Sequence, residues 1–202
     1  MNSLAIYDLK YAPATFDFAN FLAAARLYFA CKTGKTQFNL LIICSEFRNK
    51  SPRDISVSVE EKIWRLYNLI LPITSCSSFL NEIKVSFERP KLLDNDAIIY
   101  PPDYRLDKQH DPFYYFSGVL KPLYQHLKGF LHPACFQAPT YIYEQAKNII
   151  DNKERVALIS PRSTSFEVSR NSPTKSIVEL INLLKNHNFN VMIIPDQGSD
   201  RR

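Results

Sequence analysis

Glycine is scarce in this chain of 202 residues, which contains only four glycines. No G-x-G-x-x-G can be formed from their spacing, so the usual dinucleotide-binding fingerprint is excluded. The stretch "TGKT" at residues 33–36 ends like a phosphate-binding P-loop, but Phe29 stands where that motif needs its first glycine. We therefore interpret Gly34 as the C-cap of a preceding helix.

Cysteine and histidine are also few, with four of each, and they are spread along the chain. No C-x-x-C is present and the spacings give no clustered ligand set, so we expect no metal site. Unclustered thiols indicate reduced cysteines in a cytoplasmic protein. The N-terminus lacks a basic segment followed by an apolar run, which predicts no signal peptide. The longest apolar helix candidate, residues 63–80, contains Arg65, Asn68 and Pro72, so we expect no transmembrane segment.

Charge of either sign is moderate. The formal net charge is +5, with 46% hydrophobic and 22% charged residues, the balance of an ordinary globular protein. The positive excess mildly favours acidic ligands. Lysine and arginine are scattered rather than gathered into a dense basic stripe, so we expect no nucleic-acid partner. Peripheral contact with a membrane stays open.

Strand and helix patterns alternate along the chain. Apolar or alternating runs predict strands at residues 4–9, 38–45, 82–88, 97–102, 156–159 and 191–194. Helical spacing predicts helices at residues 16–32, 60–71, 140–150 and 173–186, with a mostly helical stretch over 111–150. We expect Ile63, Leu66, Tyr67 and Ile70 to share one face, with a kink at Pro72. The alternation predicts an α/β fold with a mainly parallel, Rossmann-like sheet and flanking helices.

The pattern restarts near Val156. We therefore expect a first Rossmann-like domain at residues 1–150, with bridging helices, and the first β-α-β of a second unit at residues 151–202. Two strands make a poor independent sheet. Either the chain is part of a longer two-domain protein, or the last two strands complete the first sheet.

The crossing from the strand at 156–159 to the following helix is the richest candidate ligand site. Ligands of open α/β sheets bind at the carboxyl ends of strands. Arg162 and Arg170 lie in this crossing, and either can hold a phosphate or carboxylate with paired hydrogen bonds. Ser172 is the expected N-cap of the helix, whose free N–H groups favour anions. The alternative is that both arginines are solvated loop residues and Ser172 only a cap.

Two other strand ends are weaker candidates, namely residues 101–104 and the end of the first strand. Asp8 is a weak candidate for a catalytic base or a ribose ligand, and it could equally cap the loop that follows. Thr15 is the expected N-cap of the first helix, with Asp17 favourable in its first turn. The aromatic run at residues 113–116 could stack on a sugar or base, although core packing explains its helical spacing better.

The chain resembles a family of bacterial proteins identified as glycosyltransferases and associated with surface-polysaccharide biosynthesis. The resemblance rests on "IYDLKYAPATFDFANFLAAA" at residues 6–25, "EEKIWRLYNLILP" at 60–72, and "SPRSTSFEVSRNS" at 160–172 with "IIPD" at 193–196. It implies the GT-B architecture, in which two Rossmann-like domains face a cleft. By this resemblance Arg162, Arg170 and Asn171 line the cleft near the donor phosphates, and Asp8 and Thr15 face it from the acceptor side. Most of the donor domain would then lie beyond Arg202.

Three functions follow as hypotheses. The first is a GT-B-like glycosyltransferase, or the N-terminal part of one, that transfers a sugar from a nucleotide-sugar donor to a glycan acceptor. It needs no cofactor, because arginines and a helix N-terminus can do the electrostatic work of a cation. The second is a non-catalytic Rossmann-like module that binds a phosphorylated ligand or a protein partner. The third is a phosphate-handling enzyme of another class that uses Asp8.

Overall fold

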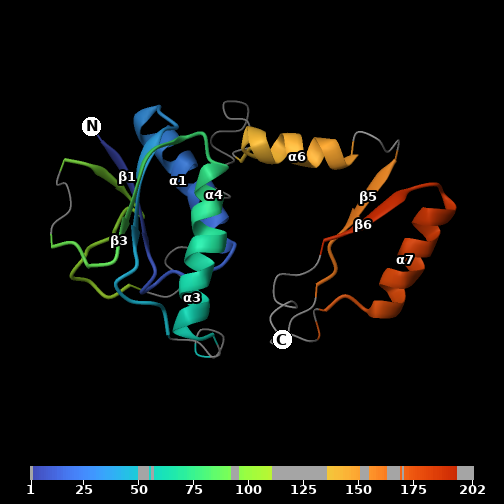
Figure 1. The fold of residues 1–202 in the computed structure, drawn as a ribbon. Coiled ribbons are helices and arrows are strands. Elements are labelled where there is room, and N and C mark those ends of the chain that lie inside the picture. The colour runs from blue at the N-terminus through green and yellow to red at the C-terminus, as the bar shows by residue number, and fades with distance from the viewer. Residues whose placement is uncertain are drawn as a thin grey trace. The chain divides into compact units, whose positions relative to one another are not determined.

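The computed structural model describes residues 2–49, 55, 57–91, 96–110, 136–150, 155–162, 169 and 171–194. The chain divides into two compact units, Met1–Pro139 and Thr140–Arg202, which we describe separately (Figure 1). The helix at residues 140–150, which the sequence pattern placed with the first domain, belongs to the second unit.

The first unit contains a four-stranded parallel sheet in the order β3-β2-β1-β4. Its strands are β1 (Ser3–Asp8), β2 (Phe38–Ile43), β3 (Leu80–Ser86) and β4 (Ile98–Tyr100). The central strands β1 and β2 are apolar over Leu4–Tyr7 and Leu40–Ile43, as expected for strands between two covered faces. The predicted α/β fold with a Rossmann-like parallel sheet is confirmed.

Helix α1 (Asp17–Thr33) connects β1 to β2 and packs on one face of the sheet. Its buried side chains meet Ala5, Tyr7, Leu40 and Ile42 in the main core. The predicted C-cap is confirmed, since Gly34 has a φ of 70° and its N–H bonds to the Ala30 carbonyl at 3.0 Å. The predicted N-cap, Thr15, is one residue too early. Phe16 takes the N-cap position, and its side chain forms no capping hydrogen bond.

A continuous helical segment connects β2 to β3, made of α3 (Val59–Arg65), a π-helical turn η1 (Leu66–Ile70) and α4 (Leu71–Ser75). Its buried side chains include Leu66 and Ile70, which join the same core as α1. The expected apolar face is wrong in part, because Ile63 and Tyr67 are 41% and 53% exposed. The wider π-turn rotates the helix surface relative to a regular α-helix, so residue spacing alone gives the wrong face.

A smaller apolar cluster covers the opposite face of the sheet. It contains Ile6, Leu41, Ile43 and Tyr104, with Leu106 packed against it. Tyr104 and Leu106 come from the segment that follows β4. This segment therefore folds back over the second face near the carboxyl ends of the strands.

The second unit contains helix α6 (Thr140–Ile150), strand β5 (Val156–Ile159), helix α7 (Thr174–Asn186) and strand β6 (Asn190–Ile193). Strands β5 and β6 pair in parallel and form a two-stranded sheet of their own. The alternative that these strands complete the first sheet is therefore wrong. Among the described helices of both units, none has the length and apolar character needed to span a bilayer.

Candidate functional site

The carboxyl ends of the first sheet bring together segments that are far apart in the sequence. Since all four strands are parallel, the chain leaves β1, β2, β3 and β4 at the same edge. Asp8 ends β1, Arg89 lies three residues after β3, and Tyr104 lies four residues after β4. This is the edge where open α/β sheets bind their ligands.

The Asp8 carboxylate is completely buried at this edge. Its Oδ2 accepts hydrogen bonds from Arg89 Nη1 at 2.9 Å and from the Tyr104 hydroxyl at 2.6 Å. Its Oδ1 accepts a hydrogen bond from the backbone N–H of Lys10 at 3.1 Å. A buried carboxylate needs such compensation because removing its charge from water is costly. These bonds make Asp8 a group that positions Arg89 and the loop after β1.

Arg89 is fixed by further bonds along the same side chain. Its Nε and Nη2 donate to the Leu106 carbonyl at 3.2 and 2.9 Å, and Cζ lies 6.0 Å from the centroid of the Tyr11 ring. Burial lowers the pKa of Arg89, but the charge of Asp8 and the neighbouring tyrosines outweigh it, so the net pKa is raised. The guanidinium is therefore a permanent cation, and about a quarter of its side chain is exposed.

The Tyr104 phenol stays protonated, so its hydroxyl can donate a hydrogen bond. Burial, the hydrogen bond to Asp8 and the charge of Asp8 all raise the pKa of its phenol. Its ring stacks on the His110 ring at a centroid distance of 4.9 Å, and Tyr11 meets His110 edge-on at 5.1 Å. His110 Nε2 lies 2.9 Å from the Arg105 carbonyl oxygen. The segment after β4 is thus fixed by ring packing and hydrogen bonds together.

A cavity of about 390 Å³ opens beside Arg89. The positive side chains at this cavity are Lys10, Arg89 and Lys108, and Asp107 is negative. Lys10 Nζ also forms an exposed ion pair with Glu46 at 2.9 Å. The cavity is within the size range of small-ligand sites. Its cations and the rigid Arg89 suit an anionic group, which would compete with Glu46 for Lys10.

The carboxyl end of β5 in the second unit holds the strand-to-helix crossing that the sequence singled out. The Arg162 N–H donates to Ser172 Oγ at 2.9 Å, and the Ser172 N–H donates to the Arg162 carbonyl at 2.9 Å. This reciprocal pair closes the loop between the two residues. The predicted cap is wrong: α7 begins at Thr174 after Pro173, and no side chain caps it. The Ser172 hydroxyl is already used to position Arg162.

The structure brings Arg162 and Ser172 into direct contact, and Asn171 lies half-buried beside them. Arg170 and the aromatic run at residues 113–116 lie outside the described residues. Thr15 bonds with Asp17, donating to its Oδ2 at 2.6 Å and accepting from its N–H at 3.3 Å. Thr15 thus supports the start of α1 without being its N-cap.

Sequence reasoning missed Arg89 and Lys108, and it identified Tyr104 only as part of the strand end at residues 101–104. A usable signal existed for Arg89 as well, because it directly follows a predicted strand. Parallel strands bring all such positions to one edge. Their partnership with Asp8 carries no such signal, since it depends on the strand order.

Comparison of the chain with protein-family models, with curated proteins and with solved structures found no match in any of the three. Within the described ranges, no three histidine, cysteine, aspartate or glutamate side chains gather as metal ligands would. The carboxyl edges of the two sheets are therefore the features from which a function can be inferred.

Proposed function

We propose that this chain is a GT-B-like glycosyltransferase, or part of one, that binds a nucleotide-sugar and transfers its sugar to a glycan acceptor. One observation carries the proposal: each of two α/β units has an arginine just beyond the carboxyl end of a parallel strand, at a place that hydrogen bonds fix. Arg89 is held by Asp8 in the first unit, and the backbone of Arg162 is held by Ser172 in the second. Two such edges suit a reaction with two substrates.

The second edge suits the donor diphosphate in this proposal. Arg162, together with Arg170 and Asn171 eight and nine positions later in the sequence, would contact the phosphates. An arginine fork matches phosphate oxygens with paired hydrogen bonds and stabilises the charge of a departing diphosphate. The cavity beside Arg89 would hold an anionic acceptor group. A nucleotide-sugar substrate is consistent with a cytoplasmic location, which we include in the proposal.

Binding and turnover of nucleotide-sugars test the proposal. We expect a uridine, guanosine or cytidine sugar nucleotide to raise the melting temperature of the chain and to bind measurably by calorimetry. Arg162→Ala should raise Kd at least tenfold, and Ser172→Ala should raise it less, since it removes only the support of the loop. Lys175→Gln on α7 is the matched control for lost positive charge and should leave Kd unchanged. If none of these nucleotides binds, the donor site is not here.

A non-catalytic binding module is the second candidate, and one observation favours it. Asp8, the carboxylate proposed as a base, is buried and accepts three hydrogen bonds, so its oxygens do not face a substrate. Mass spectrometry separates the two candidates. Binding of a sugar nucleotide without release of the nucleoside diphosphate, with or without glycan acceptors, would favour the binding module. Release that depends on Arg162 would favour the transferase.

A further inference from the structure

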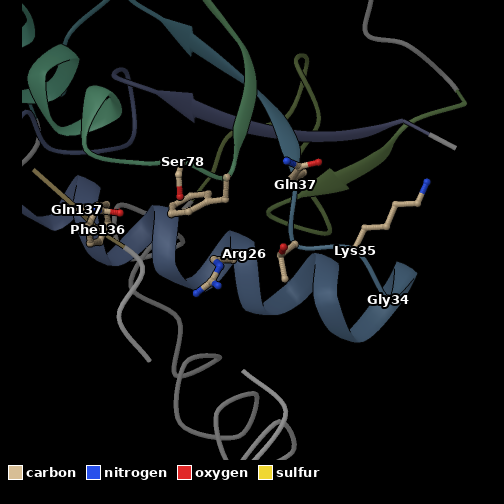
Figure 2. A pocket seen from close by; sticks show the side chains of 9 residues that line it. Arg26, Gly34, Lys35, Gln37, Ser78, Phe136 and Gln137 are labelled. Carbon is tan, nitrogen blue, oxygen red and sulfur yellow. The ribbon is translucent and has the colours of Figure 1, made fainter. Parts of the chain in front are cut away.

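A second cavity of the first unit lies at the opposite, amino edge of the sheet and has a volume of about 750 Å³. In Figure 2, Arg26 lies on α1 between Gly34 at the helix end and the pair Phe136 and Gln137. Gln37, just before β2, and Ser78, just before β3, lie above the helix. The described lining residues are Arg26, Gly34, Lys35, Thr36, Gln37, Ser78, Phe79, Phe136 and Gln137.

The walls of this cavity are fixed by hydrogen bonds and ring packing. Gly34 closes α1, and the Phe38 N–H donates to the Phe79 carbonyl at 3.2 Å. The Gln137 N–H donates to the Cys76 carbonyl at 2.8 Å. The Phe79 ring is buried and meets Phe136 edge-on at a centroid distance of 6.1 Å. A cavity with such walls is preformed, which lowers the cost of ordering on binding.

The charged side chains that line the cavity are all basic among the described residues. Arg26 and Lys35 are basic, and no described lining residue is aspartate or glutamate. Thr36 and Ser78 add hydroxyl donors, whereas Phe79 and Phe136 form an apolar side. The Arg26 guanidinium lies over the Phe79 ring, with Cζ 5.6 Å from the centroid. This places positive charge directly beside an aromatic surface.

We propose that this cavity binds a small organic phosphate, a phosphate monoester carried on an apolar or aromatic body. Two cations match the dianion, and the hydroxyls can donate to its oxygens. The apolar body would pack on the phenylalanine side of the cavity. The proposal is independent of the proposed sugar-nucleotide site. The cavity lies at the amino edge of the first sheet and includes no residue near Arg89 or Arg162.

Calorimetry with three probes tests whether both halves of the ligand are recognised. Phenyl phosphate carries the phosphate and the ring, inorganic phosphate carries only the charge, and benzyl alcohol carries only the ring. We expect phenyl phosphate to bind with a Kd at least tenfold below that of either fragment. In a ¹⁵N correlation spectrum of the protein, the amide signals that shift on adding phenyl phosphate should cluster at Gly34, Lys35 and Ser78. Equal, weak binding of all three probes, or shifts confined to the carboxyl edges, would overturn the proposal.

Single substitutions test which basic side chains bind the phosphate. Arg26→Gln should raise the Kd of phenyl phosphate about tenfold, and exposed Lys35→Gln should raise it by a smaller factor. Arg155→Gln is the matched control, because Arg155 makes the same kind of contact with Phe189 in the second unit, at 4.3 Å. The Kd of phenyl phosphate for Arg155→Gln should equal that for the native chain. If Arg26→Gln unfolds the chain, Lys35→Gln decides alone, and an unchanged Kd in that variant refutes the proposal.

Discussion

Arg89 Nη1 donates a hydrogen bond of 2.9 Å to Asp8 Oδ2, and the two residues are 81 positions apart in the sequence. Asp8 is completely buried, whereas about a quarter of the Arg89 side chain reaches solvent. The pair therefore ties the end of the central strand β1 to the segment after the edge strand β3. It also presents one face of a cation to the cavity of about 390 Å³.

Removing Arg89 should destabilise the first unit strongly. Arg89→Met leaves a buried carboxylate without its counter-charge, which we expect to cost about 3 kcal/mol. Urea unfolding followed by the fluorescence of Trp64, the sole tryptophan, reports this unit specifically. Adding Asp8→Asn to Arg89→Met should recover part of the loss, because the uncompensated charge is gone.

Lys10→Gln provides the control for that experiment. Lys10 pairs with Glu46 on the surface, and such pairs contribute about 0–1 kcal/mol. We expect Lys10→Gln to change the free energy of unfolding only slightly. Equal losses in Lys10→Gln and Arg89→Met would contradict a special role for the buried pair.

Tyr104→Phe should cost about 1–3 kcal/mol of unfolding free energy, because the buried Asp8 carboxylate loses a donor at 2.6 Å. The ring stacking with His110 is retained in this variant, so the loss reports the hydroxyl. Tyr67→Phe is a matched control, since the Tyr67 side chain on η1 is 53% exposed. A larger loss in Tyr67→Phe than in Tyr104→Phe would contradict the buried network.

Cys44 should make the first unit less stable in alkali. Burial, with a smaller contribution from Asp8, raises the pKa of the Cys44 thiol to about 12. An unfolded cysteine ionises near pH 8.5, so the unfolded chain gains stability from ionisation that the folded chain lacks. The stability contributed by this thiol is fully present below about pH 8.5 and is lost as pH rises toward 12.

Urea unfolding between pH 9 and 10 measures this effect before tyrosine ionisation dominates. Cys44→Ala should flatten the fall of unfolding free energy with pH in that interval. Leu41→Ala, on the strand β2 that Cys44 directly follows, removes packing without removing a thiol, so it should lower stability at every pH and keep the slope. An unchanged slope in Cys44→Ala would show that the thiol is not the titrating group.

Local signals explain how much of the fold was predictable. The apolar runs of β1 and β2 and the helical spacing of α1 each identify an element without reference to the rest of the chain. Predicted and observed boundaries differ by at most two residues for these elements. The π-turn at Leu66–Ile70 was not predictable in this way, because it inserts extra residues into a turn that the sequence presents as regular helix.

The candidate site was predictable only in part, for a topological reason. Asp8 is the last residue of β1 and Arg162 follows β5, and both edges could be identified from these positions alone. The Asp8–Arg89 pair depends on β3 and β4 lying on opposite sides of β1 and β2, so that the chain after β3 crosses the sheet. Strand order is not encoded in any local pattern. The prediction that Ser172 caps α7 was also wrong. A serine just before a helix can form its hydrogen bond within the preceding loop instead, as Ser172 does with Arg162.

Gly34 offers a last test, because it joins α1 to the amino-edge cavity. Its φ of 70° is strained for residues with a Cβ, yet no heavy atom outside Gly34 and its two chain neighbours lies within 4 Å of where that Cβ would stand. Gly34→Ala should therefore cost about 1 kcal/mol from backbone strain alone, and Gly34→Asn should cost less. Urea unfolding followed by Trp64 fluorescence measures both. A loss well above 3 kcal/mol would reveal a steric clash, and no loss at all would mean that the left-handed cap does not support α1.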